Sequence, residues 1–315
     1  MDACLPYASL LPGEAPQVPT VPWRTELGPQ VPLKWPRVGQ AAAAVDGALF
    51  ASSTRQEPIP TASTAKIMTA LLFLRCFPLR TGKPGPSFTV SAAEAARYLD
   101  RVANGESLVP VCEGQRFTER QALHALLAVS ANNIAEEIAR WCAGSRAGFV
   151  TEMNALARAL SMTSTRYTDP SGLDAATVST ATDQVALLRA ALRVPGFREV
   201  AGSSYTDPTG RQHANTNPLL GRLGVFAGKT GTTTAAGRNL VLAARPPARG
   251  RRPIIIAVMA QPTDTPIATA AGALLTSAAT LSSAASGRRA KATAAVLPAA
   301  GPSDEGAGSP LPLAR

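Results

Sequence analysis

Histidine and closely spaced cysteine are scarce in this chain. Its 315 residues include two histidines and four cysteines, and no Cys-x-x-Cys pair occurs. Zinc sites need such spacing, so we expect no metal site, and no cofactor is predicted. A Ser-His-Asp hydrolase is disfavoured because no Gly-x-Ser-x-Gly elbow is present. The sequence does not assign a disulfide among Cys4, Cys76, Cys112 and Cys142.

The chain also lacks a long apolar run and a basic N-terminal region. No segment is long enough to span a bilayer, so no transmembrane segment is predicted. No basic residue precedes Arg24, and the first residues contain no apolar core. The N-terminus therefore does not have the pattern of a signal peptide.

Aromatic residues make up 5% of the chain, whereas the formal net charge is +10. Such a charge attracts anionic polymers, membrane surfaces or nucleic acid. The basic clusters at residues 245–252 and 288–291 are not interleaved with aromatic residues. We therefore interpret them as a solvated loop and tail and expect no nucleic-acid partner. Steep salt-dependent DNA binding would mark the opposite hypothesis.

Proline and small residues divide the chain into three parts. Residues 1–36 contain eight prolines, which predicts an extended, disordered leader over 1–35. Residues 286–315 are rich in Ala, Pro, Gly and Ser, which predicts a disordered tail. The folded domain is predicted to span residues 36–285.

Residues 60–70, PTASTAKIMTA, place a serine three positions before a lysine at the start of an apolar run. Positions i and i+3 share one face of a helix, so Ser63 and Lys66 are expected to meet. A serine hydroxyl needs a nearby base to become a nucleophile. A lysine made neutral by burial or by another cation can be that base. The apolar residues that follow predict a buried helix.

The pattern along the chain predicts one antiparallel sheet covered by helices. A hairpin is expected at residues 41–52, with its turn at Asp46-Gly47. Helices are expected from residue 118 to Trp141, interrupted near Ser130, and at 147–160, 179–192 and 267–285. Strands are expected at 224–232, 239–244 and 254–260. We expect the first hairpin to pair with these last three strands.

Three motifs follow in order: Ser63-x-x-Lys66, Ser130-x-Asn132 and Lys229-Thr230-Gly231. Related motifs occur in β-lactamases and penicillin-binding proteins. Together with LLAVSANNIA at 126–135, DPSGLD at 169–174 and NTNPLL at 215–220, they resemble the serine D-alanyl-D-alanine carboxypeptidases, the low-molecular-mass penicillin-binding proteins. The resemblance covers about residues 36–285.

The resemblance implies an α/β fold of the β-lactamase/transpeptidase type. Its sheet of five antiparallel strands is flanked by helices on both faces, and a helical subdomain carries the Ser-x-Asn motif. Residues 36–285 would then be the catalytic domain. The implied partners are the D-Ala-D-Ala terminus of peptidoglycan stem peptides and β-lactam antibiotics. The implied location is extracytoplasmic, in the cell envelope.

The resemblance also implies roles for the matching residues. Ser63 would be the nucleophile, Lys66 its base, and Ser130 the proton relay to the leaving amine. The substrate-binding residues would then be Asn132, Lys229, Thr230, Gly231 and Thr232. Asn132 would bind the substrate amide, Lys229 would supply positive field, and Thr230 would contact the terminal carboxylate. The backbone N–H groups of Ser63 and Thr232 would form the oxyanion hole. Gly231 would let the substrate lie along the strand edge.

The chain departs from the family pattern at two positions that matter for these roles. Asn133 stands where the family usually has an aspartate. Gln261-Pro262-Thr263 follows the last strand where many members carry a carboxylate-binding arginine. Arg238 is a conceivable substitute for that arginine. The alternative, which the sequence supports at least as well, is that Arg238 is a solvated residue at the start of a strand.

Two other functions share the same fold. A serine β-lactamase of the closest architecture uses a Glu-x-x-x-Asn loop between the second and third motifs. None of the glutamates between Ser130 and Lys229 has an asparagine four residues later. An inactive binding module is disfavoured because all three motifs are intact, and it would take no covalent penicillin label.

Overall fold

The computed structural model describes residues 25–26, 33–45, 49–245 and 252–296. Its strands are β1 (Thr25–Glu26), β2 (Gln40–Val45), β3 (Leu49–Ser52), β4 (Ile59–Pro60), β5 (Ser87–Thr89), β6 (Arg116–Thr118), β7 (Val178–Ser179), β8 (Tyr205–Thr206), β9 (Gln212–His213), β10 (Val225–Thr233), β11 (Gly237–Ala244) and β12 (Ile254–Gln261). Its helices are the 3₁₀ turn η2 (Ala62–Ala65), α1 (Lys66–Cys76), α2 (Ala92–Ala96), α3 (Tyr98–Ala103), α4 (Glu119–Ala128), α5 (Asn132–Ala143), α6 (Arg146–Ala159), α7 (Ala181–Ala191), α8 (Pro195–Val200) and α9 (Ile267–Val296).

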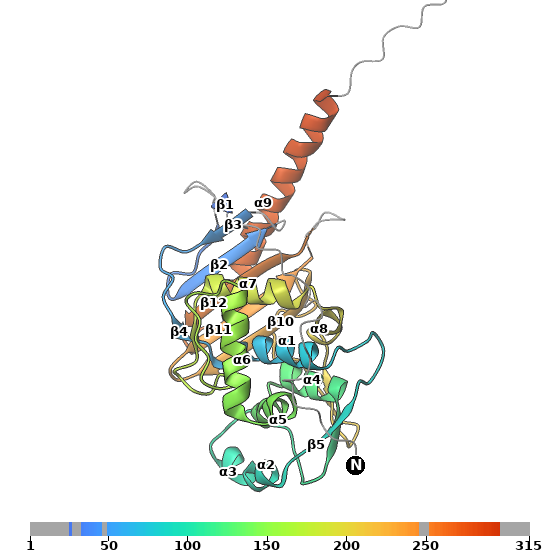
Figure 1. Ribbon diagram of the computed structural model, residues 1–315. Coiled ribbons are helices and arrows are strands. Elements are labelled where there is room, and N and C mark those ends of the chain that lie inside the picture. The colour runs from blue at the N-terminus through green and yellow to red at the C-terminus, as the bar shows by residue number, and fades with distance from the viewer. Residues whose placement is uncertain (1–24, 27–32, 46–48, 246–251, 297–315) are drawn as a thin grey trace, which may run out of the picture.

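The main sheet has the strand order β1-β3-β2-β12-β11-β10 (Figure 1). The five strands β3, β2, β12, β11 and β10 are each antiparallel to the next in this order, and the two-residue β1 lies parallel to β3. The hairpin β2–β3 joins the last strands through β12. The predicted five-stranded antiparallel sheet is therefore confirmed, and β10 is left at one edge.

Alternating residues of the central strands face two different cores. On β12, Ile255 and Ala257 belong to the core shared with α1, α4, α5 and α7, whereas Ile254 and Ile256 belong to the core shared with α9. A strand buried on both faces is a near-continuous apolar run, as the sequence IIIAVMAQ of β12 shows. The small residues of β2, sequence QAAAAV, leave room for α7 and α9 on opposite faces.

The buried helix predicted after Ser63 is present as α1. Every residue from Lys66 to Leu74 in this helix is buried. It packs against α4, α5 and α7, and the α-helix begins at Lys66 rather than at Ser63, which lies in the preceding turn η2. The helices α4, α5, α6 and α7 also lie where the sequence predicts them.

The structure differs from the predicted disordered ends at both boundaries. Within the predicted leader, Thr25–Glu26 form β1, and Leu33 is buried in the α9 core. At the other end α9 continues to Val296, past the predicted boundary at residue 285, and Figure 1 shows it projecting from the body. Its Ala-rich sequence favours helix. Residues 1–24, 27–32 and 297–315 lie outside the described residues, as does the predicted turn at Asp46-Gly47.

The described part of the chain contains no helix with the length and apolarity needed to cross a bilayer. In the same part, Cys76, Cys112 and Cys142 are free thiols, and Cys4 lies outside it.

Glu119, the first residue of α4, carries a buried carboxyl group without a partner. Neither of its oxygens has a hydrogen-bond partner among the described residues, and Oε2 lies against Gly85. Burial raises the pKa of Glu119 to about 7, although Arg120 opposes this shift. Since the folded state holds this proton more tightly than the unfolded chain, stability is expected to fall as pH rises from about 4.5 to about 7.

Replacing Glu119 with glutamine is therefore expected to raise the melting temperature more at pH 7.5 than at pH 4.5. The measurement is thermal unfolding followed by circular dichroism at both pH values. Glu113→Gln is the matched control, because Glu113 is exposed and should give no such difference. An equal effect of Glu119→Gln at both pH values would contradict the assignment of a buried, protonated carboxyl.

Candidate active site

Ser63 lies in the turn η2, at the entrance to the buried helix α1. The preceding residue, Ala62, has a φ of 46°, which is disfavoured for residues other than glycine. Such a conformation persists where neighbouring contacts hold it. Asn239 of β11 supplies such contacts by donating to the carbonyl oxygens of Pro60 and Thr61 at 3.1 and 2.8 Å. The sheet therefore fixes the turn that carries Ser63.

Lys66 is fully buried and its amine has three neighbours at hydrogen-bond distance. Nζ lies 2.8 Å from Ser63 Oγ, 2.7 Å from Asn132 Oδ1 and 2.9 Å from the carbonyl oxygen of Ser171. The last two atoms can only accept hydrogen bonds. In the neutral amine, two N–H groups serve these acceptors and the lone pair faces the Ser63 hydroxyl. The predicted Ser63–Lys66 contact is present, in the geometry that proton transfer needs.

Burial is the main cause that lowers the pKa of Lys66 well below its ordinary value. The positive charge of Lys229 lowers it further, whereas the carboxylates of Asp169, Glu106 and Glu136 oppose the shift. Lys229 is itself buried, and its burial lowers its pKa to about 7. Two buried lysines in one site therefore favour a neutral Lys66 at neutral pH.

The Ser-x-Asn motif occupies the junction between α4 and α5. Ser130 has a φ of 67°, and its buried hydroxyl has no hydrogen-bond partner among the described residues. Asn132 is the first residue of α5, and its side-chain oxygen accepts from Lys66. A buried hydroxyl without a partner is unfavourable unless another group binds to it, as a reacting substrate would.

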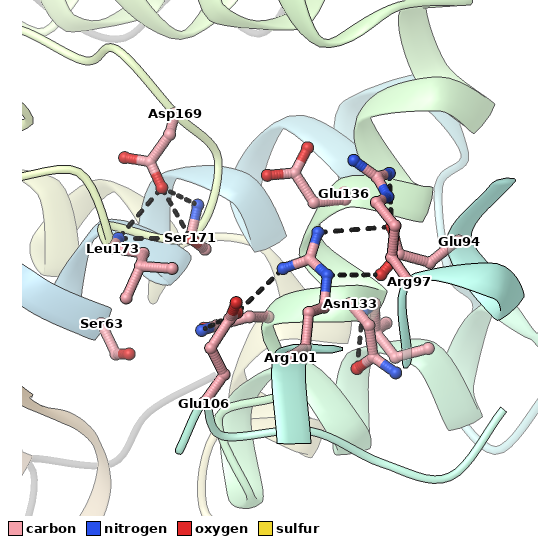
Figure 2. A network of polar contacts seen from close by, with 12 residues as sticks. Ser63, Glu94, Arg97, Arg101, Glu106, Asn133, Glu136, Asp169, Ser171 and Leu173 are labelled. Carbon is pink, nitrogen blue, oxygen red and sulfur yellow. Dashed lines mark hydrogen bonds and ion pairs between the residues drawn. The ribbon is translucent and has the colours of Figure 1, made fainter. Parts of the chain in front are cut away.

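A loop that the sequence predicts only as a turn completes the Lys66 environment. Asp169 is buried and accepts hydrogen bonds from Ser171 N and Oγ, Leu173 N and Thr177 Oγ1. Figure 2 shows the first three of these residues beside Ser63. This arrangement directs the carbonyl oxygen of Ser171 to Lys66. A Cβ at Gly172, whose φ is +77°, would meet the carbonyl oxygen of Ala62 at 1.8 Å, so the loop can approach η2 only with glycine there.

The edge strand β10 brings the third motif to the same place. Lys229 Nζ donates to the carbonyl oxygen of Thr230 at 2.9 Å, and Thr230 Oγ1 lies 2.7 Å from Thr216 Oγ1. Thr232 is exposed on this strand. The NTNPLL segment thus reaches the site through Thr216, a contact that the sequence reasoning did not assign.

Gly231 lies against the turn that carries Ser63. A Cβ at this position would meet Ser63 N at 2.8 Å and Thr61 O at 2.9 Å. The missing side chain therefore makes room for the backbone of the turn that carries Ser63, in addition to the role toward substrate that the resemblance implies. Close packing of β10 against the Ser63 turn is what requires glycine here.

The residues at which the chain departs from the family pattern have structural contacts. Asn133 is buried, donates to the carbonyl oxygen of Val109 at 2.7 Å and accepts from Val109 N. Gln261 is buried and donates to the carbonyl oxygen of Val38 at 2.6 Å. Arg238 pairs with Thr232 across the sheet, and its Nε donates to the carbonyl oxygen of Thr263 at 2.9 Å.

Comparison with known proteins agrees with this geometry. The profile of a peptidase family described as D-alanyl-D-alanine carboxypeptidase matches residues 41–263. The D-alanyl-D-alanine carboxypeptidase DacB2 of Mycobacterium tuberculosis is 35% identical over 68% of this chain and 70% of its own length. A D-alanyl-D-alanine endopeptidase of Pseudomonas aeruginosa is 31% identical over 58% of this chain and 59% of its own length. The crystal structure of the Streptomyces K15 DD-transpeptidase superposes with a TM-score of 0.65 at 26% identity, covering 78% of this chain and 98% of that one.

Proposed function

The chain belongs to the D-alanyl-D-alanine carboxypeptidase family, and we propose that it removes the terminal D-alanine from peptidoglycan stem pentapeptides through an acyl-enzyme on Ser63. The observation that carries this proposal is the contact between Ser63 Oγ and the buried amine of Lys66 at 2.8 Å. A nucleophile and a base within hydrogen-bond distance are the minimum that acyl transfer needs.

The acylation step follows from the contacts around Lys66. Ser63 Oγ attacks the carbonyl carbon between the two D-alanines while its proton passes to Lys66 Nζ. The backbone N–H groups of Ser63 and Thr232 stabilise the oxyanion. Ser130, whose hydroxyl has no other partner among the described residues, gives its proton to the nitrogen of the leaving D-alanine and takes up in return the proton that Lys66 accepted. The C–N bond breaks and an ester on Ser63 remains, which water then hydrolyses.

Three polar residues would hold the substrate during this step. Asn132 would donate to a substrate carbonyl through its side-chain nitrogen, and Thr230 would donate to the terminal carboxylate. Lys229 would add positive field near that carboxylate. Arg238 would replace the carboxylate-binding arginine of other members through its terminal guanidinium nitrogens, because its Nε already donates to the carbonyl oxygen of Thr263.

Acyl-enzyme release separates this function from that of a β-lactamase. No glutamate between the second and third motifs has an asparagine four residues later, and three of these four glutamates have partners other than Ser63. Glu137 accepts from Ser91 Oγ, and Glu136 and Glu199 form ion pairs with Arg146 and Arg120. A dedicated base for the deacylating water is typically worth about 10²–10⁴-fold, so its absence from these positions favours a long-lived penicilloyl-enzyme.

The decisive experiment compares a pentapeptide ending in D-Ala-D-Ala with penicillin. We expect continuous release of D-alanine from the peptide. With penicillin we expect one covalent adduct per chain by mass spectrometry, with negligible turnover. The leaving D-alanine diffuses away, whereas the opened thiazolidine stays attached and blocks the water. Rapid penicillin hydrolysis without D-alanine release would instead support a β-lactamase.

A cross-linked stem-peptide dimer is the second substrate to test, since several relatives are named D-alanyl-D-alanine endopeptidases. Cleavage of the dimer faster than of the pentapeptide would assign this chain to endopeptidase activity. Both substrates occur in peptidoglycan, and we infer that the protein acts in the cell envelope.

A further inference from the structure

A carboxylate outside the three motifs contacts the site. Glu106 lies in the connection between α3 and β6, and its Oε2 accepts from Asn132 Nδ2 at 2.9 Å and from an Arg101 guanidinium nitrogen at 2.8 Å. Its side chain is 9% exposed. Neither the motifs nor the charge pattern of the sequence indicated this residue.

Backbone contacts hold Glu106 in place from two sides. Its N–H donates to the carbonyl oxygen of Arg101 at 3.1 Å, which closes the end of α3. The next residue, Ser107, accepts from the N–H of Asn132 at 2.8 Å. The connection therefore lies along the first turn of α5, and the Glu106 side chain is directed at the Asn132 amide.

A network of ion pairs, buried at Glu94 and largely buried at Arg101, supports Glu106 on the side away from Asn132. Arg101 bridges Glu106 and Glu94, and Arg97 also binds Glu94, as Figure 2 shows. Glu94 is fully buried and the Arg101 side chain is 12% exposed. Buried ion pairs contribute little net stability compared with apolar residues, because the ions lose their hydration. We therefore interpret these ion pairs as a device that holds the Glu106 carboxylate at the Asn132 amide, rather than as a source of stability.

We propose that Glu106 is a positioning residue for the acylation step, which orients the Asn132 amide and places negative charge opposite Lys66. The inference rests on the proposed function of Ser63 and Lys66. The carboxylate can only accept and therefore engages Asn132 Nδ2, while Lys66 engages Oδ1. These two bonds exclude the flipped amide. They leave the second N–H of Nδ2 for the substrate carbonyl.

The charge of Glu106 gives the proposal a second consequence. The charged groups that face Lys66 are Lys229 on β10, Asp169 in the 168–174 loop, Glu136 on α5 and Glu106 itself. Glu106 is one of the three carboxylates that favour the protonated form of Lys66. Removing its charge should make Lys66 deprotonate at lower pH.

Two substitutions separate orientation from charge. Glu106→Gln keeps an oxygen acceptor for Asn132 but removes the charge. We expect its acylation rate at the alkaline plateau to stay within about threefold of wild type, and the acid limb of its pH profile to move to lower pH. Glu106→Ala removes the acceptor as well. We expect its plateau rate to fall about tenfold, the effect of one lost hydrogen bond in the transition state, with penicillin and with the pentapeptide.

The experiment measures the acylation rate by penicillin against pH for wild type, Glu106→Gln, Glu106→Ala, Asn132→Ala and the double variant Glu106→Ala/Asn132→Ala. Melting temperatures establish that each variant is folded. Glu113→Gln is the matched control for charge, since Glu113 is exposed, and its profile should equal that of wild type. In the double variant we expect the loss from Glu106→Ala to disappear, because it acts through Asn132.

A wild-type plateau in folded Glu106→Ala would overturn the proposal, as would losses from Glu106→Ala and Asn132→Ala that multiply independently. An unchanged acid limb in Glu106→Gln would overturn its electrostatic part. Failure of wild type to form any penicillin adduct would instead refute the proposed function, so the two failures are distinguishable.

Discussion

Replacing Ser63 with alanine is expected to abolish both D-alanine release and covalent penicillin labelling. The change removes the oxygen that forms the ester in the proposed mechanism, and loss of the serine nucleophile of a serine protease lowers kcat by about 10⁶-fold. Ser63 is half-buried and its hydroxyl contacts Lys66, so alanine fits the same space. The fold should therefore be retained.

The measurements are D-alanine release from the pentapeptide and intact-protein mass spectrometry after incubation with penicillin. Ser87→Ala serves as the matched control, since Ser87 is exposed on β5, and it should label like wild type. A penicillin adduct that survives on the folded Ser63→Ala protein would show that another residue is the nucleophile.

Replacing Lys66 with arginine is expected to lower the acylation rate by about 10²–10⁴-fold, the usual contribution of a general base. Guanidinium stays protonated at every accessible pH, whereas burial and Lys229 both favour a neutral Lys66 amine. The arginine side chain is also larger than the fully buried space that Lys66 fills. Lys83→Arg is the matched control, because Lys83 is exposed.

In the wild-type enzyme the same assignment predicts that acylation accelerates as pH rises. A lysine whose pKa is lowered in the folded protein is the active, neutral base above that pKa and is inactivated by protonation below it. Burial lowers the pKa of Lys229 to about 7, and the charge of Lys229 lowers the pKa of Lys66, so the acid limb depends on the protonation of both lysines. The profile is measured as single-turnover penicillin acylation. A flat profile, with chemistry shown to be rate-limiting, would contradict a neutral Lys66 base.

Local spacing was sufficient to predict the contact between Ser63 and Lys66 at the start of α1. Ser63 and Lys66 lie three residues apart, and their side chains meet across the junction of η2 and α1, in a turn that Asn239 of β11 holds from outside the motif. The apolar run that follows also predicted burial correctly, because a helix that is apolar all round has no face for solvent. The pairing of the first hairpin with the last strands followed from their order and from the turn-rich links between them.

The sequence by itself thus determined the contact between Ser63 and Lys66, the helices around them and the antiparallel sheet. The tertiary structure alone decided which distant groups surround that pair. The Ser171 carbonyl on Lys66, the Glu106 carboxylate on Asn132 and the Ser63 backbone beside Gly231 come from segments separated by tens of residues. Backbone carbonyls carry no residue-specific signal, and a single glutamate resembles any solvated acid until packing removes its water. Such contacts depend on how the elements pack, which periodicity and motif spacing do not encode.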